Sequence, residues 1–141
     1  MIEELGLRDA QQLLREKITG HLGCNVEGEP YVVPISYVYE DDCLYIHSLP
    51  GRKIEALRAH PRACLQVDEV TDAFNWRSVI AFGQYEEITD LQERELIMTS
   101  LFKRLPHLTP VEAKLTRNSP APIVFRLRVE RITGITEHWN G

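Results

Sequence analysis

The amino-acid sequence predicts a mainly β domain with α additions, built as a small closed or nearly closed antiparallel barrel. Segments rich in β-branched and aromatic residues follow one another with short turns between them, as in a meander of hairpins. Helical periodicity is confined to a few stretches, and 141 residues without an internal repeat suit a single domain over residues 1–141. The six predicted strands are residues 18–26, 31–39, 43–48, 62–70, 76–88 and 123–132.

Three helices are expected around these strands. Residues 7–16 predict a short helix within an N-terminal helical segment, residues 1–17. Residues 51–60 predict a second helix, which ends at its last residue because a residue before proline avoids the helical region. Residues 90–105 show the clearest helical spacing of apolar side chains and are closed by Pro106.

The C-terminal part of the chain is expected to be less regular. Residues 108–116 predict a further short turn of helix, and residues 119–122 a rigid extended connector. Gly134 is expected to end the last strand, which leaves residues 135–141 as a tail. This tail is expected either to cover a pocket or to be disordered.

Pro34 stands in the middle of the strand predicted over residues 31–39, where a ladder hydrogen bond is expected. Proline has no backbone N–H, so a strand tolerates it only at an edge or a bulge. Two interpretations remain open. Either the backbone groups of Val33, Ile35 and Ser36 are free to meet a ligand, or the segment is a plain edge strand.

The segment from His47 to Lys53 joins a strand to a helix through Pro50 and Gly51. Arg52 and Lys53 fall in the first turn of that helix, where cations oppose the macrodipole. The free N–H groups of a first turn, together with two cations and a nearby serine, can bind a phosphate. The alternative interpretation is a solvated surface turn.

Trp76, Arg77 and Ser78 open the strand predicted over residues 76–88, which is expected to be buried on both faces. Tryptophan can pack on a flat ring, and arginine can bind a phosphate or a ring carbonyl with two hydrogen bonds. The residues therefore suit the rim of a binding site. A surface cap on the barrel is the alternative.

Composition and charge exclude several classes of function. A formal net charge of −5 argues against generic binding to nucleic acid or anionic membranes, and no segment resembles a membrane span or a signal peptide. Cys24, Cys43 and Cys64 fit reduced thiols, so a cytoplasmic location is expected. No metal site is expected, because His21 and Cys24 fall on opposite faces of a strand.

Taken in order, these motifs resemble the pyridoxamine 5′-phosphate oxidase-like family, and within it the branch of Nim-type flavoproteins related to 5-nitroimidazole resistance. The resemblance covers nearly the whole chain, from Thr19 to about Gly134. It rests on Tyr31-Val32-Val33-Pro34-Ile35-Ser36-Tyr37, His47-Ser48 with Gly51-Arg52-Lys53, His60-Pro61, Trp76-Arg77-Ser78-Val79-Ile80-Ala81-Phe82-Gly83 and Pro122-Ile123-Val124-Phe125-Arg126.

The resemblance implies an FMN-binding split barrel of six antiparallel strands that works as a homodimer, with FMN at the subunit interface. The ring would be lined by one set of residues and the phosphate by a second, and a third set would close the pocket in part from the partner subunit. In that order the three sets are Val33, Pro34, Ile35, Ser36 and Tyr37; His47, Ser48, Arg52 and Lys53; and Trp76, Arg77 and Ser78.

An FMN-dependent oxidoreductase is therefore expected, acting on a small acceptor such as a nitro-aromatic or quinone-like compound, with NAD(P)H or another electron donor. His47 and Tyr37 are the candidate proton donors. True pyridoxamine 5′-phosphate oxidase activity is not expected, because the sequence shows no arginine and histidine arrangement that would commit the pocket to that substrate. Ile135 also stands where the family often has a basic residue.

Two alternatives from other functional classes stay open. One is a non-catalytic flavin- or haem-binding carrier, in which His21 or His47 would be the axial haem ligand. The other is a ligand-free barrel dimer that acts as an interaction module.

Overall fold

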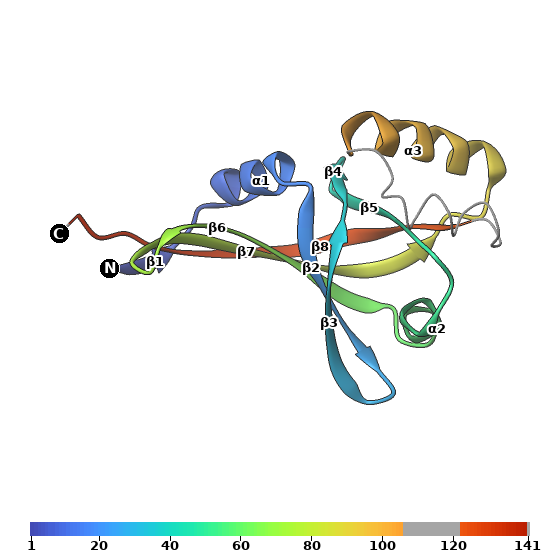
Figure 1. The fold of residues 1–141 in the computed structure, drawn as a ribbon, viewed down its shortest axis with the longest axis horizontal. Helices are drawn as coiled ribbons and strands as arrows, with labels where there is room; N and C mark the ends of the chain where they lie inside the picture. Colours follow the sequence, from blue (N-terminus) through green and yellow to red (C-terminus); the bar gives the residue numbers. More distant parts are fainter. Residues whose placement is uncertain (106–121, 141) are drawn as a thin grey trace.

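The structure, a computed structural model, describes residues 1–105 and 122–140. In chain order its elements are β1 (Ile2–Glu4), α1 (Leu7–Glu16), β2 (Thr19–Val26), β3 (Glu29–Ser36), β4 (Val38–Glu40), β5 (Cys43–Ser48), α2 (Arg52–Ala59), β6 (Arg62–Asp72), β7 (Asn75–Glu87), α3 (Leu91–Arg104) and β8 (Ile123–Glu137). The strands form one antiparallel sheet in the order β3-β2-β6-β7-β8-β5-β4, with β1 paired to β8 (Figure 1). The predicted mainly β class with helical additions is confirmed.

Tyr37 joins the two end strands of the sheet. β3 and β4 stand at opposite ends of the sheet order, yet only this residue separates them in the sequence. Tyr37 is fully buried, and its hydroxyl donates to the carbonyl oxygen of Leu14 at 2.7 Å. Its backbone N–H donates to the carbonyl oxygen of Ile18 at 2.9 Å. The prediction of one strand over residues 31–39 is therefore wrong, because the buried tyrosine divides that strand into two.

The hydrophobic core lies between the sheet and the first two helices. Leucine predominates in it, and aromatic and β-branched side chains of the long strands complete it. Its fully buried members include Leu13, Leu14, Leu22, Leu44, Ile46, Ile54, Leu57, Leu65, Val79, Phe125 and Leu127. On β7 this core covers one face only: Val79 and Ala81 are buried, whereas Ile80 and Phe82 on the opposite face are half-buried. The expectation that β7 is buried on both faces is wrong within a single chain.

The last strand runs further than the sequence predicted. Gly134 does not end β8, which continues to Glu137, and Gly134 pairs with Val79 of β7. The glycine is needed for close approach: a Cβ at this position would lie 3.0 Å from the Cβ of Leu5. The N–H of Leu5 also donates to the carbonyl oxygen of Gly134 at 2.9 Å. The glycine therefore allows the N-terminal segment to approach β8 and to pair with it as β1, a strand that the sequence did not predict.

The C-terminal tail packs against the far end of the β6–β7 hairpin. Trp139 meets Phe74 edge to face, with 5.3 Å between ring centroids, and the backbone N–H of Trp139 donates to the side-chain oxygen of Asn75 at 3.0 Å. Both termini lie at this end of the molecule, where β6, β7 and β8 extend from the barrel as an arm (Figure 1). The described part of the tail is thus held in place, and it lies away from the segment between β5 and α2.

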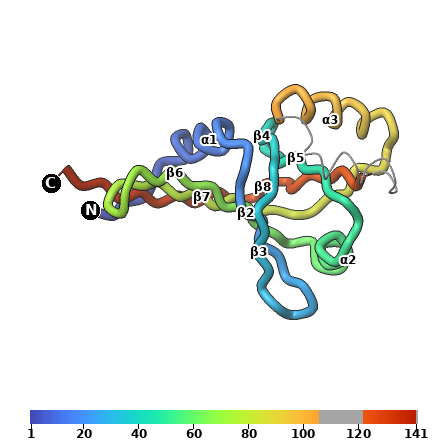
Figure 2. The backbone as a smooth tube through the Cα atoms, in the orientation of Figure 1, coloured from blue at the N-terminus to red at the C-terminus, as the bar shows by residue number. Residues whose placement is uncertain are grey.

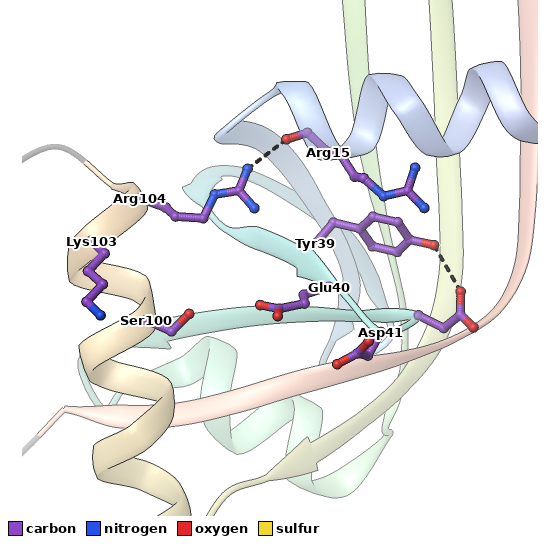
Figure 3. Close-up of a pocket in the computed structure, with 8 residues that line it drawn as sticks. Arg15, Tyr39, Glu40, Asp41, Ser100, Lys103 and Arg104 are labelled. Atoms are coloured by element: carbon purple, nitrogen blue, oxygen red, sulfur yellow. Dashed lines mark hydrogen bonds between the residues drawn. The ribbon is translucent and has the colours of Figure 1, made fainter.

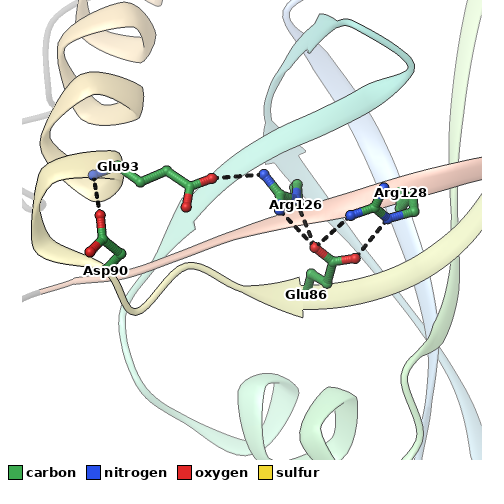
Figure 4. A network of polar contacts seen from close by, with 5 residues as sticks. All are labelled: Glu86, Asp90, Glu93, Arg126 and Arg128. Carbon is green, nitrogen blue, oxygen red and sulfur yellow. Dashed lines mark hydrogen bonds and ion pairs between the residues drawn. The ribbon is translucent and has the colours of Figure 1, made fainter.

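An ion-pair network connects α3 to the barrel (Figure 4). Arg126 of β8 donates to Glu86 of β7 at 2.9 Å and to Glu93 of α3 at 3.0 Å. Arg128 holds the other oxygen of Glu86 at 2.7 Å. Asp90 caps the helix by accepting the N–H of Glu93 at 2.9 Å. Arg126 thereby fixes the start of α3 over the sheet.

This network gives the fold a dependence on pH that can be measured. Arg128, followed by Arg126, lowers the pKa of Glu86 from 4.5 to about 2. A carboxyl group whose pKa is lower in the folded state stabilises the fold above about pH 4.5, and this contribution is lost as the pH falls towards about 2. We expect Glu86→Gln to lower the free energy of unfolding at neutral pH and to have little effect near pH 2, as measured by urea unfolding. An equal loss at both pH values would contradict this assignment.

Some predictions fall outside the described residues. They are the closure of α3 by Pro106, the helical turn over residues 108–116 and most of the connector over residues 119–122. Within the described residues, no helix is long and apolar enough to cross a membrane.

Candidate functional site

The segment between β5 and α2 forms the strand-to-helix turn that the sequence predicted. Ser48 ends the strand, and Gly51 stands at the N-cap of α2 with an extended backbone. No side chain of the described residues caps this helix, so N–H groups of its first turn lack a side-chain acceptor. Figure 2 shows that α2 lies beside the β2–β3 hairpin, which projects from the body of the molecule.

The two cations at the start of α2 have different surroundings. Arg52 is exposed and forms an ion pair with Glu27 in the β2–β3 turn, at 3.1 Å. This exposed pair contributes about 0–1 kcal/mol, so an incoming anion can displace it readily. Lys53 is half-buried and forms no ion pair with a carboxylate of the described residues. The β2–β3 hairpin therefore already supplies a carboxylate to one of the two cations that the sequence places in the first turn of α2.

Burial lowers the pKa of Lys53, an effect that the nearby Cys24 thiol partly offsets. Neither Cys24 nor Cys64, which lies next to Cys24, provides a counter-charge, because burial raises the pKa of both thiols. Both thiols therefore stay protonated near neutral pH, as structural cysteines do. Lys53 is thus a partly desolvated cation at a helix N-terminus, a combination that favours the approach of an anion.

His47 and Ser48 precede this turn. The ring of His47 lies 5.8 Å from that of Phe102 in α3, centroid to centroid. The hydroxyl of Ser48 donates to the carbonyl oxygen of Leu49 at 3.1 Å, which leaves its oxygen able to accept. Both side chains are half-buried and lie on the strand end that leads into α2.

The open side of β3 presents a different set of backbone groups from the one predicted. Tyr37 donates its N–H to Ile18 in continuation of the β2–β3 register, so odd-numbered residues of β3 direct their backbone groups towards β2. Val33 and Ile35 are among them, and the prediction that their groups are free is wrong. Ser36 and Pro34 face the open edge, where Pro34 offers only its carbonyl oxygen.

Tyr37 is a core residue. Its side chain is fully buried, and its hydroxyl is held by Leu14. Burial also raises the pKa of this hydroxyl well above its usual range. A phenol with these properties has no exposed donor to offer a substrate, so the structure gives no support to Tyr37 as a proton donor.

Trp76, Arg77 and Ser78 lie in the arm, where each has a partner in its own chain. The indole N–H of Trp76 donates to Glu137 at 2.8 Å, Arg77 pairs with Glu69 at 2.9 Å, and Ser78 accepts from Gln66 at 3.1 Å. These side chains stand at the opposite end of β7 from the strand ends that flank His47. From Trp76 to Glu87, at the other end of β7, the distance along the strand is about 36 Å at about 3.3 Å per residue. One chain does not bring the two groups together.

Comparison of the sequence with known protein families identifies the family of this chain. The profile of the pyridoxamine 5′-phosphate oxidase family matches residues 7–136. The chain belongs to this family. A curated relative, an uncharacterised protein of Rhizobium meliloti, is 32% identical over 122 residues, which are 80% of each chain.

Solved structures of similar proteins agree with this family membership. An FAD-binding protein of Mesorhizobium loti is 33% identical and has a TM-score of 0.80, over 98% of this chain and 99% of that one. A Bacteroides thetaiotaomicron protein named for 5-nitroimidazole antibiotic resistance is 22% identical and has a TM-score of 0.73, over 96% of this chain and 87% of that one. The second likeness shows the fold alone.

Proposed function

We propose that this family member is a homodimeric flavoprotein that uses a bound flavin nucleotide to reduce a small acceptor. Lys53 carries the proposal. It is a half-buried cation in the first turn of α2, without a carboxylate partner among the described residues. A flavin phosphate bound there would accept hydrogen bonds from Lys53 and from the first-turn N–H groups. Arg52 would also bind it once Glu27 is displaced.

The isoalloxazine ring would lie towards the open edge of β3. Ser36 and Pro34 would meet the ring edge, while Val33 and Ile35 hold the strand to β2. His47 and Ser48 would stand between ring and phosphate. The residues of the chain bind and orient the flavin, and the flavin when bound supplies the redox chemistry.

A second subunit would supply Trp76, Arg77 and Ser78. Their distance from α2 within one chain supports this, since a shared site requires them to come from a partner. The half-buried Ile80 and Phe82 on the outer face of β7 also suit a two-fold interface. We therefore place the flavin between subunits, where the arm of one covers the turn of the other.

FMN is the cofactor proposed from the sequence motifs. FAD has the same ring and a phosphate in the same place, and the 33% identical Mesorhizobium loti protein binds FAD. The acceptor proposed is a nitro-aromatic or quinone-like compound, as in the nitroimidazole-resistance branch, and NAD(P)H is the proposed donor. The order of the sequence motifs supports this narrower assignment.

The purified chain, titrated with FMN and with FAD, tests this function. We expect a yellow complex that absorbs at about 450 nm and is bleached by NAD(P)H, with recovery of the band when a nitroimidazole or a quinone is added. A stable flavin complex that NAD(P)H does not bleach, and that a nitroimidazole or a quinone does not reoxidise after reduction by dithionite, would favour a flavin carrier. A Soret band after growth with haem, or no binding of either flavin, would overturn the proposal.

A further inference from the structure

A cleft of about 680 Å³ lies between the end of α1, the β4–β5 turn and the C-terminal half of α3 (Figure 3). It is separate from the turn between β5 and α2 that carries the proposed function. One side of the cleft is cationic, with Arg15 on α1 and Lys103 and Arg104 on α3. The other side is acidic, with Glu40, Asp41 and Asp42 at the end of β4 and in the turn that follows.

The cations on the first side lack acidic partners. Arg15, Lys103 and Arg104 form no ion pair with a carboxylate of the described residues. One nitrogen of Arg104 donates to the carbonyl oxygen of Arg15 at 3.0 Å, which fixes the guanidinium and leaves other donors. The Arg15 guanidinium lies over the Tyr39 ring, 5.6 Å from its centroid. Two helices thus bring like charges together without neutralising them, an arrangement that an anionic ligand would stabilise.

The acids on the opposite side form a second unneutralised group. Glu40 and Asp41 also form no ion pair with the described cations, and Asp42 is held by the hydroxyl of Tyr39 at 3.1 Å. Because these carboxylates face the cations across a common space, a ligand with both charges matches the cleft better than a simple anion does.

A smaller pocket of about 220 Å³, with polar and apolar lining residues, adjoins the cleft and shares Glu40, Asp41 and Ser100 with it. Its apolar lining comes from β4, β5 and α3 and consists of Val38, Tyr45, Leu96, Ile97 and Leu101. One water occupies about 30 Å³ in the liquid, so the pocket has room for a branched aliphatic group or one aromatic ring. Glu40 and Asp41 lie where the pocket adjoins the cleft, so they favour a positively charged group of a ligand between the pocket and the cationic side.

We propose that this cleft binds a small zwitterion of the α-amino acid class with an apolar side chain. The carboxylate lies against Lys103, Arg104 and Arg15. The ammonium group lies against Asp41 and Glu40, and the side chain enters the pocket between β4 and α3. An α-amino acid carries these three groups on one carbon, as the three adjoining surfaces require. This site does not depend on flavin binding.

Calorimetric titration of the full chain with L-phenylalanine and three truncated analogues tests the site. The analogues are 3-phenylpropionate, which lacks the amine, phenethylamine, which lacks the carboxylate, and glycine, which lacks the side chain. We expect each analogue to bind at least about tenfold more weakly than L-phenylalanine, since each leaves one surface of the cleft unmatched.

Two variants assign the charges. Lys103→Gln is expected to weaken L-phenylalanine and 3-phenylpropionate about tenfold and to leave phenethylamine unchanged. Asp41→Asn has the opposite pattern, and asparagine tolerates the left-handed backbone at this position, where φ is 52°. Arg8→Gln, an exposed arginine of α1 outside the cleft, is the control and should change nothing.

Three results would overturn the proposal. They are no binding of L-phenylalanine at about 10 mM, equal binding of L-phenylalanine and an analogue, and the same losses in Arg8→Gln as in Lys103→Gln.

Discussion

Lys53→Met is expected to weaken flavin binding by about 10- to 100-fold, because it removes a charge-assisted contact to phosphate that contributes about 1.5–3 kcal/mol. The same variant should keep or slightly raise the free energy of unfolding. Burial lowers the pKa of Lys53, which means that the folded chain disfavours the ammonium charge. Methionine keeps the apolar stem and removes that charge.

The neighbouring arginine provides a matched comparison. Arg52 is exposed and already paired with Glu27, so Arg52→Gln should weaken flavin binding by only a few-fold. Fluorescence quenching of FMN and FAD by each variant gives the affinities, and urea unfolding gives the stabilities. An Arg52→Gln loss larger than that of Lys53→Met would show that the exposed arginine, rather than the half-buried lysine, holds the phosphate.

Gly83→Ala is expected to destabilise the fold by about 1–3 kcal/mol, the range for overpacking a close-packed site. Gly83 lies at the irregularity in the β7–β8 ladder, and an added Cβ would collide with the backbone carbonyl group of Arg128. A backbone atom cannot move aside as a flexible side chain can. The two strands must therefore separate locally, in the longest pairing of the described sheet.

Gly6→Ala is the control for this prediction. Gly6 stands at the N-cap of α1, and a Cβ there would meet no atom within 4 Å. The change should alter the free energy of unfolding by less than about 1 kcal/mol, because the N-cap preference for glycine over alanine is offset in part by the lower entropy of the unfolded alanine chain. Chemical unfolding of the two variants beside the parent chain measures the difference, and equal effects would contradict the close approach of β7 and β8.

Local patterns predicted most of the fold and part of the site. Pro50 and Gly51 mark the strand-to-helix turn, and the first-turn position of Lys53 follows from that turn alone. The two-residue alternation of β6 was equally visible. These features depend on neighbours in the sequence, which is why they could be predicted without a fold.

Features that depend on distant partners could not be predicted. Glu27 neutralises Arg52 only because the β2–β3 hairpin bends towards α2. Nothing in the sequence around Tyr37 distinguishes a buried tyrosine from an exposed one. Its burial follows from the packing of α1, where the carbonyl oxygen of Leu14 accepts a hydrogen bond from its hydroxyl. Gly134 was predicted to end the strand. A glycine is needed there because Leu5, from the other end of the chain, packs closely against it.

The cleft beside α3 gave no sequence signal for a related reason. Arg15, Tyr39 and Lys103 come from three elements that are far apart in the chain, and no spacing rule connects them. Trp76 presents the reverse case. Its residue type suggested a binding rim, but the register places it at the other end of β7 from the strand ends beside His47.

A subunit-mixing experiment tests most directly the central claim that two chains share each flavin site. Lys53→Met and Trp76→Ala should each bind flavin weakly as separate homodimers. When equal amounts are dissociated and reassociated, half of the dimers are mixed, and each mixed dimer regains one site with both native residues. We therefore predict that about a quarter of the sites bind flavin with the parental affinity. A mixture that binds only as weakly as the two separate variants would contradict the shared site.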